Sequence, residues 1–370
     1  MFLKSLELEN YRNYEKLSLI FDEHTNIFFG NNAQGKTNIL ESIYVACTTK
    51  SHRRSKDSEI IRFESESSHI RLILEKKQIS YRIDMQLGQR KKKSVAINLL
   101  PIRKASELLG VANIIFFSPE DLNIIKNGPQ ERRRFVDMEL CQLDKMYLSD
   151  LVNYQKCLNQ KNKLLKDISG RLRGDSEVYG TLDIWDEQLR MYGSRVIERR
   201  RRFIDDLCPI LKEKHTFLTG GNEKIDLIYE PNIDIDNYET KLAQSRSKDL
   251  KYGTTNVGPH RDDINFLIKN WDLRKYGSQG QQRTASLALK LSEIELVKKA
   301  IKDTPVLMLD DVLSELDKNR QDCLLQSIEG VQTFLTCTGL DEFVRNHFSN
   351  DHVFYVEHGM VSEIDKKGSF

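Results

Sequence analysis

The sequence predicts an α/β fold in which one core is divided along the chain by a mostly helical insertion. Near the N-terminus, a short apolar run, a glycine-rich loop at Gly30–Thr37 and a helical pattern follow one another directly. Far downstream, a second apolar run ends in Asp310 and Asp311, which is typical of a buried parallel strand. Between these two segments the apolar residues recur mostly at helical spacing.

The composition is that of a globular protein. The chain has 370 residues, of which 39% are hydrophobic and 30% charged, enough for the core of one large or two moderate domains. No apolar run approaches the roughly 20 residues that cross a bilayer, and residues 1–9 alternate like a strand rather than a signal peptide. We therefore expect a cytoplasmic protein that binds no membrane. The six cysteines are scattered singly, which favours free thiols over a zinc site.

Residues 1–118 are expected to form the first part of the core. Alternating apolar and polar residues predict strands with one buried face. The run at 26–29 leads into the glycine loop, and a helix follows at 38–44. The other strands are expected at 2–9, 16–21, 70–75, 79–87, 94–99 and 113–117.

Residues 119–253 are expected to form a mostly helical lobe. A serine in the N-cap position followed by a proline marks its start at 118–119. Apolar residues then recur at steps of three, four or seven, which predicts helices over about 130–168 and over 182–211. The glycine-rich segment 170–180 is the expected turn between them.

Residues 254–370 are expected to complete the core. The apolar run at 305–309 predicts the buried strand that delivers Asp310. A helix is expected over 280–301, and further strands are expected at 264–268, 333–337 and 353–357. One more strand, at 225–229, is expected within the helical lobe.

The loop fits the pattern Gly-x-x-x-x-Gly-Lys-Thr between a strand and a helix, the context in which this pattern binds phosphate. Its backbone N–H groups can point at phosphate oxygens, and the helix adds the positive end of its dipole. Lys36 is expected to reach the β- and γ-phosphates of ATP, and the Thr37 hydroxyl to bind Mg²⁺. The predicted nucleotide-binding residues are Gly30, Asn31, Asn32, Ala33, Gln34, Gly35, Lys36 and Thr37.

The two aspartates supply the acidic side of the predicted site. A carboxylate at the end of a buried strand is unfavourable unless it meets a cation, and the Mg²⁺ of a nucleotide supplies one. We expect Asp310 to bind Mg²⁺ with Thr37, and Asp311 to face the attacking water. Lys36, Asp310 and Asp311 are thus the predicted catalytic residues. As a general base, Asp311 is one methylene shorter than a glutamate, which favours slow hydrolysis.

A turn at Ser278-Gln279-Gly280-Gln281 precedes the helix expected over 280–301. A serine hydroxyl and glycine amides at a helix N-terminus can bind an anion. Alone, this serine-glycine turn is also explained as a plain helix cap. Together with the glycine loop and the aspartate pair it predicts a second phosphate contact, made by Ser278, Gly280 and Gln281.

These motifs together resemble the ABC-type heads of SMC-like DNA repair ATPases, and among them the RecF family of bacterial recombination mediators. The resemblance covers nearly the whole chain. It is carried by segments 8–14, 30–38, 117–122, 132–137, 258–263 and 310–317.

The resemblance implies an ABC-type ATPase head that is split in sequence, with the helical lobe inserted. In such heads two protomers enclose two ATP molecules, each held by the glycine loop of one protomer and the Ser-x-Gly turn of the other. It implies that Lys36, Thr37 and Asp310 bind the nucleotide in cis, whereas Ser278 and Gly280 reach the γ-phosphate in trans. Asp317 corresponds to a loop that contacts the second protomer.

The resemblance also implies the cofactors and partners. Proteins of this family bind DNA near junctions of single strand and duplex and, with RecO and RecR, help RecA to load onto gaps. We therefore expect ATP and Mg²⁺ as cofactors, DNA as a partner, an ATP-dependent homodimer, and slow, DNA-stimulated ATP hydrolysis. The implied processes are recombinational repair, replication restart and the SOS response.

Two positions depart from the general ABC pattern. Transporter-type heads carry a glutamine where the first lobe meets the helical one, but this chain has Ser118-Pro119-Glu120. A histidine usually follows the last core strands, where this chain has Cys337-Thr338. Thr338 is expected either to sense the γ-phosphate or simply to end a strand.

The basic charge is concentrated near the nucleotide loop. Residues 50–104 hold 15 Lys or Arg against 6 Asp or Glu, whereas residues 203–270 hold 9 against 12. This asymmetry favours DNA phosphates as the partner of the first segment, although charge runs are also ordinary solvated faces. The candidate contacts are Lys50, His52, Arg53, Arg54, Lys56 and the run Arg90-Lys91-Lys92-Lys93.

Other features have more than one explanation. The run Arg199–Arg202 lies on a predicted helix and suits either DNA or salt bridges with nearby acids. For His260, a network that braces a loop is favoured over a metal or acid–base role. An ATPase subunit coupled to a membrane or other protein partner would use the same head. The intact Lys36, Thr37 and Asp310 argue against a scaffold with an inactive nucleotide site.

Overall fold

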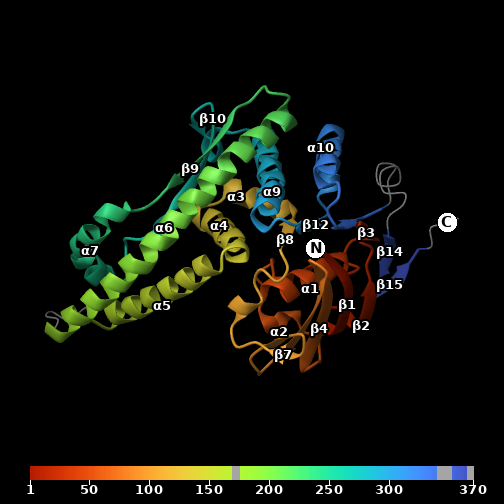
Figure 1. Ribbon diagram of the computed structural model, residues 1–370, viewed down its shortest axis with the longest axis horizontal. Coiled ribbons are helices and arrows are strands. Elements are labelled where there is room, and N and C mark those ends of the chain that lie inside the picture. The colour runs from red at the N-terminus through yellow and green to blue at the C-terminus, as the bar shows by residue number, and fades with distance from the viewer. Residues whose placement is uncertain (169–175, 340–351, 365–370) are drawn as a thin grey trace. The chain divides into compact units, whose positions relative to one another are not determined.

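The computed structural model describes residues 1–168, 176–339 and 352–364 (Figure 1). The chain divides into two compact units: Met1–Asp121 with Glu293–Phe370, and Leu122–Ser292. Residues 254–292 thus belong to the second unit, whereas the sequence predicted that the core resumes at residue 254. The reason is that β10 (Asp263–Ile268) pairs antiparallel with β9 (Ile225–Glu230), which ties this segment to the inserted lobe.

The first unit contains an antiparallel sheet of six strands in the order β2-β1-β4-β5-β6-β7. Its inner face carries every second residue, among them Leu6, Leu8, Ile70 and Leu72, all fully buried. The β1–β2 hairpin turns at 12–13, between the two paired tyrosines Tyr11 and Tyr14. The strands are β1 (Phe2–Tyr11), β2 (Tyr14–Ile20), β4 (Ser67–Lys76), β5 (Ile79–Gly88), β6 (Ser94–Ile97) and β7 (Leu100–Pro101).

A second sheet of the same unit has the order β15-β14-β3-β13-β12-β8. Its five strands from β14 to β8 run parallel, and its central strands are buried on both faces, as parallel strands are. The strands are β3 (Thr25–Phe29), β8 (Ile114–Phe117), β12 (Val306–Asp310), β13 (Thr333–Cys337), β14 (His352–Glu357) and β15 (Met360–Glu363).

Parallel strands place their carboxyl ends at one edge of the sheet, and ligands of such sheets bind there. The glycine loop follows β3, and Asp310 ends β12, with only β13 between these two strands. The sheet order therefore explains how segments far apart in sequence form one site. The helices of this unit are α1 (Lys36–Thr48), α2 (Asp57–Ile60) and α10 (Lys318–Ile328), and α9 (Gln279–Ile301) crosses the boundary between the units.

The second unit is mostly helical. α5 (Lys145–Ile168) and α6 (Ser176–Thr219) lie side by side (Figure 1) and bury Leu158, Leu165, Leu182 and Leu189. A three-stranded sheet in the order β11-β10-β9 completes it. Its other elements are α3 (Leu122–Lys126), α4 (Pro129–Leu143), α7 (Tyr238–Tyr252), β11 (Trp271–Asp272) and α8 (Leu273–Tyr276).

Two helix predictions need correction. The single helix expected over 130–168 is broken at Asp144, whose extended backbone ends α4. The Asp144 carboxylate accepts hydrogen bonds from the N–H groups of Met146 (2.8 Å) and Tyr147 (3.0 Å), and so caps the start of α5.

The helix expected over 182–211 is longer than predicted. α6 runs from Ser176 to Thr219 and continues through Pro209. Residues 176–180 of the predicted turn are helical, and residues 170–175 lie outside the described part of the chain. None of the helices within the described ranges is both long and apolar enough to span a bilayer.

Candidate functional site

The glycine loop between β3 and α1 has a backbone that only glycine fits at two positions. Gly30 has φ of 150°, and a Cβ there would lie 2.3 Å from the carbonyl oxygen of Val356. Gly35, the N-cap of α1, has φ of 115°, and a Cβ there would lie 2.5 Å from Asn13 Nδ2. Ala33 also has a positive φ, of 65°. The glycines of the predicted motif are therefore required by the chain's own geometry.

Two neighbouring turns clasp the loop. From the β1–β2 turn, Asn13 Nδ2 donates to the Gln34 carbonyl (3.0 Å), and Tyr14 donates to the Gly35 carbonyl (3.0 Å). From the β14–β15 turn, the His358 N–H donates to Gln34 Oε1 (2.7 Å). We call these three contacts the loop clasp. They fix the loop in a defined shape, and Gln34 serves that shape with both its backbone and its side chain.

Lys36 lies inside the loop. Its ammonium group donates to the carbonyl oxygens of Gly30 (2.7 Å) and Asn31 (3.0 Å), and the residue is only 4% exposed. Asn31, Asn32 and Ala33 are exposed around it. A cation held beneath an exposed ring of backbone groups is an arrangement that binds phosphate.

Asp310 is held by two hydroxyl groups. Thr37 and Thr336 each donate to its Oδ1 atom at 2.8 Å, and the residue is 8% exposed. Burial raises the pKa of Asp310, and the neighbouring charge of Asp311 raises it further. A buried carboxylate beside a hydroxyl offers the hard oxygen ligands that Mg²⁺ prefers, so these residues fit the ion that a nucleotide would bring.

Asp311 is half-buried and has a left-handed backbone, with φ of 54°. Its N–H donates to Thr336 Oγ1 at 3.0 Å. Burial raises its pKa, whereas the charge of Lys36 lowers it. Thr336 therefore links the two aspartates, and the structure brings Lys36, Thr37, Asp310 and Asp311 into one site.

Thr336 was not predicted from the sequence, which pointed to Thr338 instead. Thr336 is fully buried on β13, whereas Thr338 lies beyond the end of the strand and is exposed. A polar residue at a buried position of an apolar strand was the signal that could have identified Thr336. Glu120, the other departure from the ABC pattern, lies exposed in the 3₁₀ turn Pro119–Asp121.

The serine-glycine turn, Ser278–Gln281, lies in the second unit at the start of α9. Ser278 and Gln281 exchange hydrogen bonds: the Ser278 N–H donates to Gln281 Oε1 (2.9 Å), and the Gln281 N–H donates to Ser278 Oγ (3.2 Å). This reciprocal pattern is a capping box. Ser278 and Gly280 are both exposed, and apart from its own helix backbone the nearest atom to a Cβ on Gly280, among the described residues, would be Ser278 Oγ at 3.8 Å.

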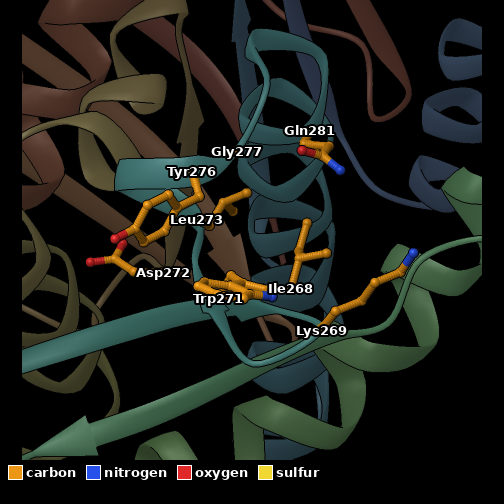
Figure 2. A pocket seen from close by; sticks show the side chains of 8 residues that line it. All are labelled: Ile268, Lys269, Trp271, Asp272, Leu273, Tyr276, Gly277 and Gln281. Atoms are coloured by element: carbon orange, nitrogen blue, oxygen red, sulfur yellow. The ribbon is translucent and has the colours of Figure 1, made fainter.

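A pocket of about 400 Å³ borders the turn (Figure 2). Trp271 and Tyr276, which are 63% and 67% exposed, pack edge to face at its rim with ring centroids 5.5 Å apart. Large exposed aromatic side chains are common where proteins meet other molecules. The residues that line the pocket are Ile268, Lys269, Trp271, Asp272, Leu273, Tyr276, Gly277 and Gln281.

Some of the candidate DNA contacts have partners within the protein; the Arg53 guanidinium, for example, donates to Asn38 Oδ1 at 3.3 Å. His52 stacks on Phe116 with ring centroids 4.1 Å apart, so its ring packs into the unit. The Lys93 ammonium pairs with Asp57 at 2.8 Å. The candidates other than His52 and Lys93 are exposed: Lys50, Arg53, Arg54, Lys56, Arg90, Lys91 and Lys92.

The arginine run on α6 contains both buried and exposed side chains. Arg200 is buried, and its guanidinium pairs with Asp137 (2.8 Å) and Asp262 (2.9 Å). Arg199 pairs with Asp150 at 2.5 Å, whereas Arg201 and Arg202 are exposed. The sequence reasoning did not anticipate a buried arginine because Asp137 and Asp262 are distant along the chain.

His260 braces a loop, as the sequence favoured. One ring nitrogen, Nε2, lies 3.0 Å from the Thr255 carbonyl, and the other, Nδ1, lies 2.6 Å from the Tyr154 hydroxyl. Because a carbonyl only accepts, Nε2 carries the proton and Nδ1 accepts from Tyr154. Burial lowers the pKa of His260 to about 4, so the ring is neutral near pH 7.

The chain is similar to known proteins over nearly its whole length. The model of the RecF/RecN/SMC N-terminal domain matches residues 2–362. The DNA replication and repair protein RecF of Agathobacter rectalis is 59% identical over 366 residues, covering 99% of this chain and 100% of the relative. The protein of the same name from Lachnospira eligens is 58% identical over 361 residues, covering 98% and 99%.

Solved structures agree with these relatives. The structure of the recombination mediator protein RecF with ATP, of the RecFOR pathway, matches with a TM-score of 0.91 and 36% identity and covers 98% of both chains. An Smc head bound to the C-terminal winged-helix domain of ScpA matches with a TM-score of 0.57 and 15% identity, covering 98% and 97%. The second likeness concerns the fold alone, which is that of an ABC-type ATPase head.

Proposed function

The chain belongs to the RecF family, whose members carry the RecF/RecN/SMC N-terminal domain. We propose that it is an ATP-gated DNA-binding protein of recombinational repair and replication. In this proposal the glycine loop holds ATP through its backbone and Lys36. When bound, Mg²⁺ neutralises charge on the phosphate oxygens. Thr37 and Asp310 supply its protein ligands.

A second copy of the chain completes the site. Ser278 and Gly280 of that copy contact the γ-phosphate, so that ATP joins the two molecules over DNA. The observation that carries this step is the open serine-glycine turn. Ser278 is exposed, and nothing in the described part of the chain requires a glycine at position 280. A glycine without an internal steric reason fits a place where another molecule approaches the backbone.

Hydrolysis then separates the pair. Asp311 orients or deprotonates the attacking water, with Thr336 fixing its backbone. Because Asp311 is shorter than a glutamate, hydrolysis is slow, and DNA accelerates it. The exposed basic residues of the first unit contact DNA phosphates at gaps and junctions. In this proposal the chain acts with RecO and RecR to help RecA load onto DNA, as part of the SOS response.

Two variants test the ATP-driven pairing. Lys36→Ala should lose nucleotide binding, because the loop then holds no cation for the β- and γ-phosphates. Ser278→Arg should still bind ATP but fail to dimerise, because a bulky side chain fills the contact in trans. Sedimentation velocity with and without ATP measures pairing, and a fluorescent ATP analogue measures binding. ATP-driven dimerisation of Ser278→Arg would rule out the role of the turn in trans.

DNA binding needs its own test. Titrations of duplex, gapped and tailed DNA at several salt concentrations, with and without ATP, measure both the preferred DNA and the gating. We expect the affinity to rise with ATP and to fall steeply with salt, because phosphate contacts release counterions. An affinity that does not depend on nucleotide would contradict gating.

A further inference from the structure

Glu223 lies next to the serine-glycine turn in space although it is distant in sequence. Its Oε1 atom accepts a hydrogen bond of 2.7 Å from Gln281 Nε2. The other end of the same amide, Gln281 Oε1, accepts from the Ser278 N–H at 2.9 Å. Glu223, Gln281 and Ser278 thus form a chain of hydrogen bonds, all within the second unit.

Glu223 helps to fix which way the Gln281 amide points. A carboxylate only accepts hydrogen bonds, so it selects the NH₂ end of the amide. The oxygen end is then left to face Ser278. A flipped amide would place oxygen against carboxylate and NH₂ against the Ser278 N–H, and both bonds would be lost. The Ser278 N–H, which only donates, favours the same orientation, so the two contacts reinforce each other.

Gln281 also contacts the Ser278 hydroxyl, through its backbone N–H, so the residue that Glu223 holds in place bonds Ser278 at two points. Ser278 Oγ accepts from the Gln281 N–H at 3.2 Å, so its own proton points away from that bond. Ser278 is exposed, and its O–H is left to donate outward. A hydroxyl aimed in this way is what a γ-phosphate oxygen requires.

Glu223 is itself on a short, well-braced loop between α6 and β9. Gly220 and Gly221 end α6 with φ of 61° and 81°. The Gly221 N–H donates to the Thr216 carbonyl at 2.9 Å, and Asn222 Nδ2 donates to the Thr219 carbonyl at 3.0 Å. Both bonds hold the loop against the last turns of the 44-residue helix α6.

We propose that Glu223 is a positioning residue for the contact in trans: through Gln281 it orients Ser278 toward the γ-phosphate and ties the serine-glycine turn to the end of α6. This inference rests on the proposed function, since it assigns a residue to the same contact. Glu223 itself touches no nucleotide. Its effect should therefore fall on pairing and leave nucleotide binding by the single molecule unchanged.

The first experiment compares Glu223→Ala with Glu213→Ala, which removes the same charge from an exposed position on α6. We expect the dissociation constant of the ATP-bound dimer to rise about tenfold in Glu223→Ala, which corresponds to about 1.4 kcal/mol. Glu213→Ala should pair like the parent protein, and both should bind a fluorescent ATP analogue equally well. Equal pairing by the two variants, or weaker nucleotide binding by Glu223→Ala, would overturn the inference.

A swap of donor and acceptor gives a stricter test. Gln281→Glu should weaken pairing by more than tenfold, because two carboxylates then face each other. Adding Glu223→Gln should bring pairing back to within about threefold of the parent protein, because the new amide can donate to the new carboxylate. No recovery in the double variant would overturn the inference, even if either single variant folds poorly.

Ser278→Arg separates this inference from the proposed function. If Ser278→Arg still dimerises with ATP, the contact in trans is wrong, and the role of Glu223 falls with it. If Ser278→Arg loses pairing while Glu223→Ala keeps it, only the positioning role is wrong.

Discussion

The Thr37 hydroxyl donates a hydrogen bond of 2.8 Å to the Asp310 carboxylate across 273 positions of sequence. The order β3-β13-β12 in the parallel sheet makes this contact possible, because it brings the ends of both strands to one edge. These two oxygen atoms are the ligands proposed above for Mg²⁺.

Asp310→Asn tests the ligand role of this carboxylate. The amide oxygen can still accept from Thr37 and Thr336, but the buried charge is gone. Because burial raises the pKa of Asp310 in the folded state, the charged form destabilises the nucleotide-free protein near pH 7. We therefore expect the variant to be more stable than the parent protein in the absence of nucleotide. Chemical denaturation in EDTA measures this change.

The same variant should lose at least about tenfold in Mg²⁺-dependent ATP affinity, since one ligand of the ion is missing. Isothermal titration with and without Mg²⁺ measures this loss. Unchanged Mg²⁺ dependence would show that Asp310 is not a ligand.

Thr336→Val removes the hydroxyl that joins the two aspartates while keeping the shape of the side chain. The Asp311 N–H and Asp310 Oδ1 would each lose a partner. We expect a loss of about 1–3 kcal/mol in the free energy of unfolding, measured by urea titration. Thr338→Val, at an exposed position, is the control and should stay within about 0.5 kcal/mol.

Gly280→Ala distinguishes an effect on the stability of the single molecule from an effect on ATP-driven dimerisation. Space for a Cβ is available, and alanine favours a helix over glycine by roughly 0.5–1 kcal/mol. The thermal midpoint should hold or rise, while ATP-driven dimerisation should weaken about tenfold, or 1.4 kcal/mol, because the Cβ meets the partner. Gly35→Ala should behave in the opposite way, with impaired nucleotide binding in the monomer. Normal pairing by Gly280→Ala would contradict the contact in trans.

His260 should make the second unit sensitive to acid. Its folded pKa of about 4 lies below the unfolded value of about 6.5, so between these values the unfolded chain binds more protons. Stability is therefore lost as the pH falls from about 6.5 toward 4, by up to about 3 kcal/mol. Urea unfolding measures the loss of unfolding free energy between pH 7.5 and pH 5, and this loss should be smaller for His260→Gln than for the parent protein. An equal loss in both proteins would assign the acid sensitivity to other groups.

Arg200→Met should be severely destabilising. It leaves the carboxylates of Asp137 and Asp262 without the cation that both contact. Removal of one partner from a buried ion pair costs about 3–5 kcal/mol. Arg201→Met removes an exposed neighbour and should change the unfolding free energy by less than about 0.5 kcal/mol. Similar melting curves for the two variants would refute the buried network.

Local patterns predicted much of the fold. The strands and helices around the glycine loop, and the strand before Asp310, were visible because alternation and apolar runs depend on neighbouring residues. α7 and α10 were missed because they are rich in polar side chains, which leave few apolar residues to mark a helical spacing. The break at Asp144 was missed because this one residue ends α4 with its extended backbone and caps α5 with its carboxylate, without disturbing the apolar spacing.

The site was predictable to the extent that it follows the loop pattern. Lys36, Thr37 and Asp310 were found from their motifs, whereas Thr336, Asn13 and Tyr14 were not. Their roles depend on the order of strands in two sheets and on the position of a hairpin turn. Such contacts between distant segments leave no mark in the spacing of residues along the chain.

The loop clasp formed by Asn13, Tyr14 and His358 has a kinetic consequence. A cradle that is already shaped loses little conformational entropy when it takes up a triphosphate. Loading with nucleotide then needs no rearrangement of the loop. In the proposed mechanism the limiting event is the meeting of two ATP-bound molecules, so the number of copies on one stretch of DNA, rather than the nucleotide supply, governs how often the dimer forms.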